Sequence, residues 1–193
     1  MSGGLMSDFI ISDHINGLVT IPRIRHEDRR GHFEEVYSSR IASLFPNGIK
    51  QISHSHNKRN VLRGLHLQID PPMSKIMRVV RGCAQIVHLD LNPYSSTYGN
   101  VVAQVVAEDS DYMLYGSAYI ARGFLTMMDN TVIEYLHNAE FNSARTYTVA
   151  WDDPRIKSCW YLSPTDEKEL ILSDNDRDHG MSFESWKSVV GCP

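Results

Sequence analysis

The stretch Val61-Leu62-Arg63-Gly64-Leu65-His66-Leu67-Gln68 predicts a β-strand. Its last four residues alternate between apolar and polar side chains, a period that is typical of a strand with one buried face. Similar short segments recur along the chain, and Gly, Pro, Asn or Asp separates most of them. They are Gly17–Ile21, Phe33–Tyr37, Lys75–Val80, Ala84–Leu91, Asn100–Ala107, Asp111–Tyr115, Ala118–Ala121, Thr131–Leu136 and Arg145–Ala150. This spacing of short strands predicts an all-β sandwich or barrel.

Helical patterns are sparse in this sequence. We expect short helices only near Ser38–Phe45, Pro164–Leu170 and Ser182–Val189. A chain of 193 residues with 42% hydrophobic content can bury a core, and no repeat, low-complexity tract or linker divides it. We therefore expect a single domain over residues 1–193, in which residues 1–15 form an amino-terminal arm and residues 179–193 form a carboxy-terminal tail.

Charge and cysteine content exclude several classes of partner. The formal net charge is -4 and the basic residues form no stripe, so we expect no nucleic-acid partner. Cys83, Cys159 and Cys192 are odd in number, widely spaced and without a C-x-x-C pair, which favours a reducing cytoplasm. No run approaches the roughly 20 apolar residues that cross a bilayer, and the first residues do not resemble a signal peptide. We expect no membrane partner.

One spacing suggests a metal site, but its ligand set is incomplete. Gly48 is followed at the right distance by His54 and His56, as in the first metal-binding motif of the cupins. No carboxylate follows between residues 57 and 64, and Thr126 stands where the second motif has its histidine. Catalytic metal sites usually have at least three protein ligands, so we predict no metal and no other cofactor. The simpler interpretation of His54 and His56 is that they are polar residues at a strand end.

The stretch from Val61 to Gln68 also resembles the signature of the dTDP-4-dehydrorhamnose 3,5-epimerase family, whose members are metal-independent cupins. Further blocks of the same family follow one another in the expected order. They are Asp28–Glu35, Pro71–Pro72 with Lys75–Arg78, Asp90 with Ser96–Gly99, Arg122–Thr126, Glu134–Tyr135, Trp151–Pro154 and Leu172–Asp176. Ordered blocks over most of the chain are far more specific than one short motif. The resemblance implies a cupin-type double-stranded β-helix, a jelly-roll barrel with a few short helices.

The resemblance also implies a reaction, the epimerisation of a nucleotide-linked 4-keto-6-deoxy sugar. A ketone at C4 acidifies the hydrogens on C3 and C5, so inversion needs a base, a group that stabilises the enolate oxygen and an acid on the opposite face. At the family positions, His66 would be the base, Asp176 its partner carboxylate, Lys75 the cation near the oxygen and Tyr135 the acid. Taken singly, most of these residues have an ordinary structural interpretation, but their occurrence in family order favours the catalytic one.

Other residues stand at the family's substrate-binding positions. Arg30 and Arg63 would contact the diphosphate, because the planar guanidinium donates two hydrogen bonds to a phosphate. Phe33 and Glu35 would lie on the nucleotide side, and Gln51 would also contact substrate. The resemblance further implies a homodimer in which the segment from Arg30 to Glu35 reaches the neighbour's site.

The chain departs from the family pattern at two positions of the sugar pocket. Arg122 replaces the family's histidine, which puts a permanent cation there, and Phe141 replaces a tyrosine and so lacks a hydroxyl. Both remain candidate substrate-binding residues. The nucleotide (dTDP or GDP), the sugar, and inversion at one carbon or two stay open.

Three other functions remain as alternatives. A related 3,4-ketoisomerase would need a second histidine two residues after the first, where this chain has Gln68. A sugar-nucleotide-binding cupin without catalysis would keep Arg30 and Arg63 but has no need of the base and acid that are present. A metal-dependent oxygenase ranks last because its ligands are missing.

Overall fold

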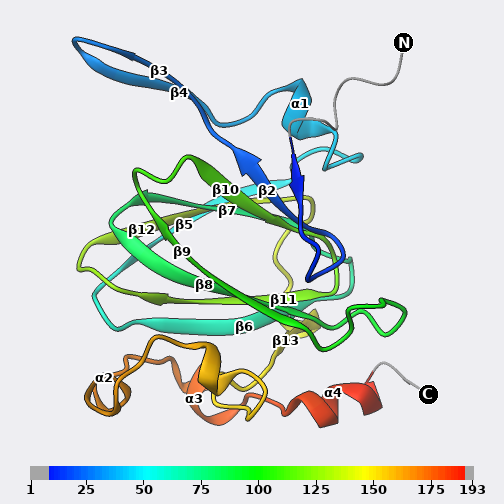
Figure 1. Cartoon of the computed structure of the whole chain (residues 1–193). Coiled ribbons are helices and arrows are strands. Elements are labelled where there is room, and N and C mark those ends of the chain that lie inside the picture. Colours follow the sequence, from blue (N-terminus) through cyan, green and yellow to red (C-terminus); the bar gives the residue numbers. More distant parts are fainter. Residues whose placement is uncertain (1–8, 190–193) are drawn as a thin grey trace.

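The computed structural model describes residues 9–189, in which two antiparallel sheets face each other (Figure 1). The larger sheet has the strand order β1-β2-β10-β7-β12-β5 and the smaller one β13-β6-β11-β8-β9. The strands of the larger sheet are β1 (Ile10–Ile11), β2 (Leu18–Pro22), β10 (Tyr112–Gly116), β7 (Lys75–Arg81), β12 (Thr131–His137) and β5 (Gln51–Asn57). Those of the smaller sheet are β13 (Thr146–Thr148), β6 (Leu62–Gln68), β11 (Ile120–Thr126), β8 (Cys83–Asp90) and β9 (Val101–Ala107). The predicted all-β architecture is confirmed.

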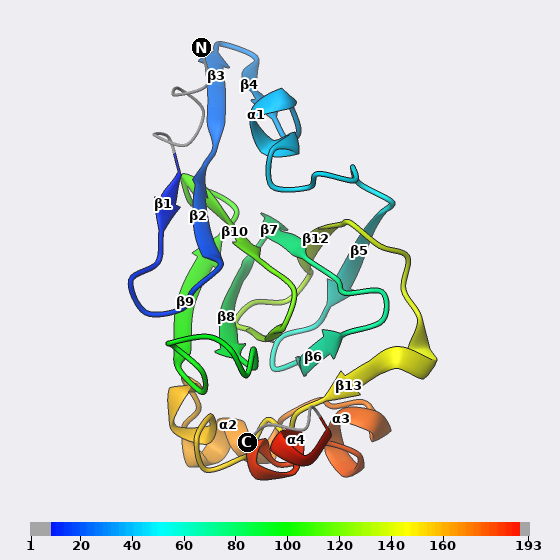
Figure 2. The ribbon, with the colours of Figure 1, turned by 90° about the vertical axis from the view of Figure 1, so that its right-hand side faces the viewer.

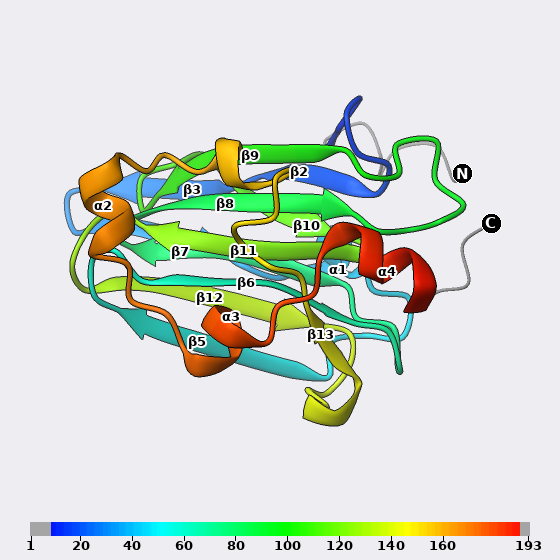
Figure 3. The same ribbon diagram turned by 90° about the horizontal axis from the view of Figure 1, so that it is seen from below.

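Helices cover the outer face of each sheet. The helix α1 (Ser39–Ala42) packs against the larger sheet through Ile41. Beneath the smaller sheet lie α2 (Pro164–Lys168), α3 (Asp174–Asp178) and α4 (Phe183–Val189), as Figure 3 shows, with the short 3-10 turns η1 (Ser143–Arg145) and η2 (Lys157–Cys159) nearby. No helix within residues 9–189 combines the length and the apolar character needed to cross a membrane.

The two chain ends contribute to this packing in their described parts. β1 pairs with β2 at the edge of the larger sheet, and Ile15 is fully buried. At the other end, the indole of Trp186 is fully buried and donates a hydrogen bond of 3.1 Å to the carbonyl of Leu91. The remainder of the expected arm and tail, residues 1–8 and 190–193, lies outside the described residues.

Several predicted boundaries are wrong. β1, β3 (Ile24–Asp28), β5 and the helix α3 were not expected, and β11 continues to Thr126 where the sequence pattern predicts a strand only over Ala118–Ala121. His54 lies in the middle of β5, whereas His56 lies one residue before its end, and both side chains point outward. The sequence pattern does not predict β5 because the inward-facing side chains of this strand are polar. A strand that packs on an apolar core would instead have apolar side chains at these positions. The sequence pattern misses the second half of β11 because both faces of this strand are buried, so its apolar and polar residues do not alternate.

β6 contains a bulge beside β11. His66 lies opposite Arg122 and Arg63 lies opposite Phe124, so three steps along β6 (66 - 63) match two along β11 (124 - 122). In a regular strand, residues three apart point to opposite faces, whereas a bulge lets both point the same way. Arg63 and His66 accordingly line the same cavities between the two sheets.

Gly64 is the residue that makes the bulge possible. Its φ is +107°, a conformation that L side chains rarely adopt. A Cβ atom added there would lie 2.7 Å from the Cα of Gly123 on β11, and one added to Gly123 would lie 2.6 Å from the carbonyl oxygen of Arg63. Two facing glycines therefore let the backbones of β6 and β11 approach closely beside His66.

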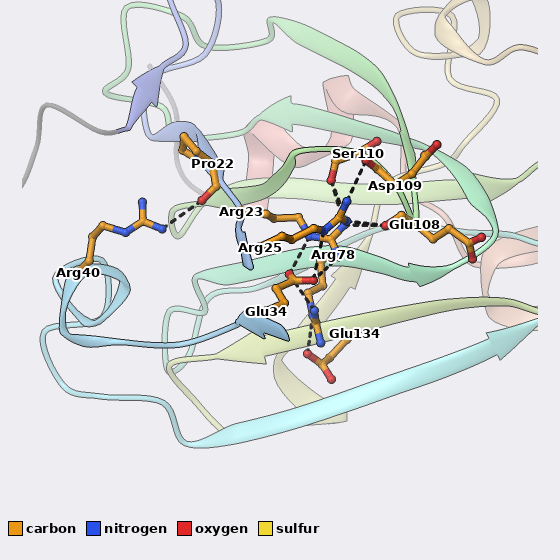
Figure 4. A network of polar contacts seen from close by, with 10 residues as sticks. All are labelled: Pro22, Arg23, Arg25, Glu34, Arg40, Arg78, Glu108, Asp109, Ser110 and Glu134. Atoms are coloured by element: carbon orange, nitrogen blue, oxygen red, sulfur yellow. Dashed lines mark hydrogen bonds and ion pairs between the residues drawn. The ribbon is translucent and has the colours of Figure 1, made fainter. Parts of the chain in front are cut away.

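The hairpin of β3 and β4 (Gly31–Glu35) extends away from both sheets (Figures 1 and 2). Its base is held by the network in Figure 4, which centres on Glu34. The Glu34 carboxylate accepts hydrogen bonds from Arg23 at 2.7 and 2.5 Å and from Arg78 of β7 at 3.1 Å, and Arg78 also donates to Glu134 of β12 at 2.8 Å. Burial raises the pKa of Glu34, but the arginines outweigh it and the net pKa is lowered. This network fixes the direction in which the hairpin leaves the barrel.

Candidate active site

Two neighbouring cavities of about 290 and 220 Å³ open between the sheets. Both are lined by Arg63, His66, Lys75 and Phe141. The larger one adds Asp176, and the smaller one adds Gln51, Arg122 and Tyr135. The structure thus gathers around one space all the predicted catalytic residues and most of the predicted binding residues.

His66 and Asp176 form a hydrogen-bonded pair at the mouth of these cavities. The His66 Nε2 and Asp176 Oδ1 atoms are 2.6 Å apart, and Asp176 also accepts from Ser173 Oγ (2.9 Å) and from the Gly64 amide (3.3 Å). Burial raises the pKa of Asp176, but the bond to His66 and the other two hydrogen bonds outweigh it, so the net pKa is lowered. A carboxylate on Nε2 holds the ring proton there and leaves the lone pair on Nδ1, which no residue within 9–189 engages.

Lys75 lies in the same space without a carboxylate partner. Within residues 9–189, no acidic side chain comes within ion-pair distance of its ammonium, while the charge of Arg122 acts on Lys75 and the charge of Lys75 acts on His137. Burial, and secondly the charge of Arg122, lower the pKa of Lys75 to about 7. An ammonium left unpaired in this way is available to an anionic or developing negative group.

The Arg122 guanidinium is buried and turned towards the backbone. It donates to the carbonyls of Gly116 (3.0 Å), Ser117 (2.8 Å) and Met73 (3.4 Å), and burial lowers its pKa to about 10. The charge of Arg122 therefore affects the cavity by lowering the pKa of Lys75, while its hydrogen bonds hold the turn before β11.

Tyr135 and His137 project from β12 into the smaller cavity. Burial raises the pKa of Tyr135 to about 12, although its bond to Ser55 and the charge of Arg63 act in the opposite direction. Burial, with the charges of Lys75 and Arg122, lowers the pKa of His137 to about 3, so this imidazole is neutral. Sequence reasoning missed His137, although its place two residues after Tyr135 puts it on the same face of the strand.

Three predicted binding residues lie elsewhere. Arg30, Phe33 and Glu35 belong to the β3–β4 hairpin, and none of them lines either cavity. The Arg30 side chain is 84% exposed and pairs with Asp28, and Phe33 is 71% exposed. Within one chain, the hairpin residues are therefore not brought to His66.

Comparisons with known sequences identify the family. The sequence model described as dTDP-4-dehydrorhamnose 3,5-epimerase matches residues 12–184. The dTDP-4-dehydrorhamnose 3,5-epimerase of Methanothermobacter thermautotrophicus is 32% identical over 182 residues, covering 90% of this chain and 94% of that protein. The enzyme of the same name from Escherichia coli K12 is 28% identical over 166 residues, with 81% and 90% covered.

Solved structures give the same result for the fold. The RmlC epimerase of Mycobacterium tuberculosis matches with a TM-score of 0.83 and 28% identity, covering 96% of this chain and 92% of that one. NovW, a 4-keto-6-deoxy sugar epimerase from the novobiocin cluster of Streptomyces spheroides, matches with a TM-score of 0.84 and 26% identity, covering 97% and 94%. The predicted cupin-type jelly roll is confirmed.

Lys75 should lose its charge as the pH rises through about 7 in the ligand-free protein. Arg122→Gln removes a like charge and should raise the pKa of Lys75, while leaving the part of the shift that burial causes. NMR titration of labelled lysine side chains, assigned with Lys75→Met, measures both values. A pKa near the usual 10.5 in the unaltered protein would contradict this description of the site.

Proposed function

The chain belongs to the dTDP-4-dehydrorhamnose 3,5-epimerase family, and we propose that its substrate is a dTDP-linked 4-keto-6-deoxy sugar. The protein is an isomerase that epimerises C3, C5 or both of a nucleotide-linked 4-keto-6-deoxy sugar in deoxysugar biosynthesis. The choice of dTDP rests on the names of these relatives. A GDP-linked sugar remains the comparison to be tested.

In the proposed first step, His66 removes a proton from a carbon beside the ketone. Nδ1 accepts this proton, since Nε2 is held by Asp176 at 2.6 Å. The electrons of the broken C–H bond form the C=C bond of an enolate, and the negative charge passes to the oxygen on C4. Asp176, with its lowered pKa, is ionised and stabilises the imidazolium that results.

The enolate is then stabilised and protonated from the other side. The unpaired ammonium of Lys75 offers positive charge to the oxygen. Tyr135 gives its proton to the carbon on the opposite face, the C4 ketone re-forms and the centre is inverted. His66 returns its proton to water and the Tyr135 phenolate takes one up, which completes the cycle. The observation that carries the proposal is the His66–Asp176 pair, which leaves Nδ1 free on a residue that lines the same cavity as Lys75 and Tyr135.

Substrate binding is proposed to use both sheets. Arg63 lies at the cavity mouth, and its two terminal nitrogens have no partner within residues 9–189, which leaves the guanidinium fork for the diphosphate. Gln51 accepts a hydrogen bond of 2.8 Å from the Phe141 amide, which fixes the loop that carries the Phe141 ring. Because Phe141 has no hydroxyl, only Tyr135 supplies a phenol among the residues of the two cavities.

The ketoisomerase alternative finds little support in the site. Gln68 stands where that reaction would need a second histidine, and its side chain is committed to the backbone. Its amide nitrogen donates to the carbonyls of Pro71 and Glu140, and its oxygen accepts from the Asn142 amide. Gln68 therefore has no free group to offer a substrate.

We also propose a homodimer in which the β3–β4 hairpin of one copy completes the site of the other. Arg30, Phe33 and Glu35 stand at the family's nucleotide-binding positions, yet none of them lines the cavities of its own chain. The exposure of Arg30 and Phe33 on a hairpin with a fixed base supports this proposal. A site shared in this way would bind the nucleotide between two chains.

Incubation in D₂O with dTDP-4-keto-6-deoxyglucose, followed by NMR, tests the reaction. We expect deuterium at C3, C5 or both, and His66→Ala should lower the exchange rate by at least about 100-fold, the usual contribution of a general base. Label at both carbons defines a double epimerase, and label at one defines a mono-epimerase. Absence of label with this substrate, alongside label with the GDP-linked equivalent, would contradict the proposed nucleotide.

Heterodimers built from two inactive chains test the shared site. A chain with His66→Ala keeps its hairpin, and a chain with Arg30→Ala and Phe33→Ala keeps its cavity. Their heterodimer, isolated with two affinity tags, should regain one working site, because the intact hairpin and the intact cavity then meet. If the heterodimer is no more active than either parent homodimer, the hairpin does not serve the partner's site.

A further inference from the structure

The inward face of β5 carries polar groups that the reaction scheme above does not use. Along this strand the outward residues Ile52, His54 and His56 are exposed, whereas Ser55 and Asn57 point into the barrel. Ser55 and Asn57 line neither of the two cavities of the candidate site, and Asn57 is only 5% exposed. A buried amide and hydroxyl in a barrel interior require hydrogen-bond partners, and those partners indicate their role.

These two residues connect Tyr135 to Arg63. The Tyr135 hydroxyl is 3.0 Å from Ser55 Oγ, and Ser55 Oγ is 3.0 Å from Asn57 Nδ2. At the other end, Asn57 Oδ1 accepts a hydrogen bond of 3.1 Å from Arg63 Nε. A continuous chain of hydrogen bonds therefore runs from the cation at the cavity mouth to the phenol inside.

The donors and acceptors in this series of hydrogen bonds follow from the groups around Asn57. Asn57 Oδ1 faces an N–H donor, and Asn57 Nδ2 faces the carbonyls of Thr131 (3.1 Å) and Ser55 (3.2 Å), so the amide cannot be reversed without placing like groups together. Ser55 Oγ shares one hydrogen of Asn57 Nδ2 with the Ser55 carbonyl and keeps its own hydrogen, which it can donate to the Tyr135 oxygen. With that oxygen receiving a hydrogen bond from behind, Tyr135 can direct its own hydrogen into the cavity.

We propose that Ser55 and Asn57 are positioning residues that aim the Tyr135 proton at the substrate and stabilise the phenolate left after its transfer. The proposal rests on the assignment of Tyr135 as the acid. Burial opposes a phenolate here, and the net pKa of Tyr135 is raised to about 12 even though the Ser55 bond and the Arg63 charge lower it. Chained donors polarise one another, so the cation of Arg63 strengthens each bond up to the phenol.

The partition between exchange and inversion tests this role. If Tyr135 cannot deliver its proton, His66 exchanges the abstracted proton with D₂O and returns a deuteron to the same face of the carbon. The substrate is then labelled without inversion. In D₂O, Ser55→Ala and Asn57→Leu should lower the ratio of inverted to retained labelled sugar by about tenfold, as expected for loss of a hydrogen bond to a charged group. Total exchange should change far less, and Ser55→Thr should restore the ratio.

Two further variants separate the possible causes. His56 lies on the exposed face of β5 between Ser55 and Asn57, so His56→Ala should leave the ratio of inverted to retained labelled sugar unchanged. Tyr135→Phe should lower the ratio at least as much as Ser55→Ala. If Tyr135→Phe lowers it and Ser55→Ala does not, or if Ser55→Ala slows exchange and inversion equally, the positioning role is wrong. If Tyr135→Phe leaves the ratio unchanged, the assignment of the acid itself is wrong, and this inference falls with it.

Discussion

The bulge at Gly64 is the constraint on which the site depends. It turns Arg63 and His66, three residues apart, towards the same cavity, and it is possible because Gly64 and Gly123 have no side chains to separate the two backbones. The same glycine donates its amide hydrogen to Asp176. One local backbone feature thus sets the direction of the proposed base, the proposed diphosphate ligand and the carboxylate that orients the base.

The inner face of the sheets is apolar around Val79, Ile86 and Ile133 but carries charged groups beside the bulge. The outer faces are packed by apolar clusters under the helices, which stabilise the barrel, while the inner face near His66 carries Lys75, Arg122 and Tyr135. Lys75 is held there without a carboxylate, and burial beside Arg122 lowers its pKa to about 7. In the proposed reaction, the negative charge that develops on the substrate would offset this electrostatic cost. Arg122, which replaces the family's histidine, also donates hydrogen bonds to three backbone carbonyls and so helps to hold the backbone around the cavity.

The sequence was most informative where the inner face is apolar or the motif is long. The strands around Lys75–Val80 and Ala84–Leu91, and the family order of His66, Lys75, Tyr135 and Asp176, were predictable. β5 was not, because its inward residues bind each other and the site, so the rule that apolar residues face inward does not apply to it. The direction of the β3–β4 hairpin depends on the contacts of Glu34 with arginines far away in sequence, and no local pattern records such contacts.

If the Gly64 bulge places the proposed catalytic groups, Gly64→Ala should slow deuterium exchange into the keto sugar. Gly48→Ala is the matched control, since Gly48 also has a positive φ of +73° but an added Cβ would meet no atom within 4 Å. With both variants shown to be folded, Gly64→Ala should exchange roughly 100-fold more slowly, as expected when a catalytic group is displaced by about 1 Å. Gly48→Ala should exchange at the unaltered rate. Equal rates in the two variants would show that the site does not depend on the bulge.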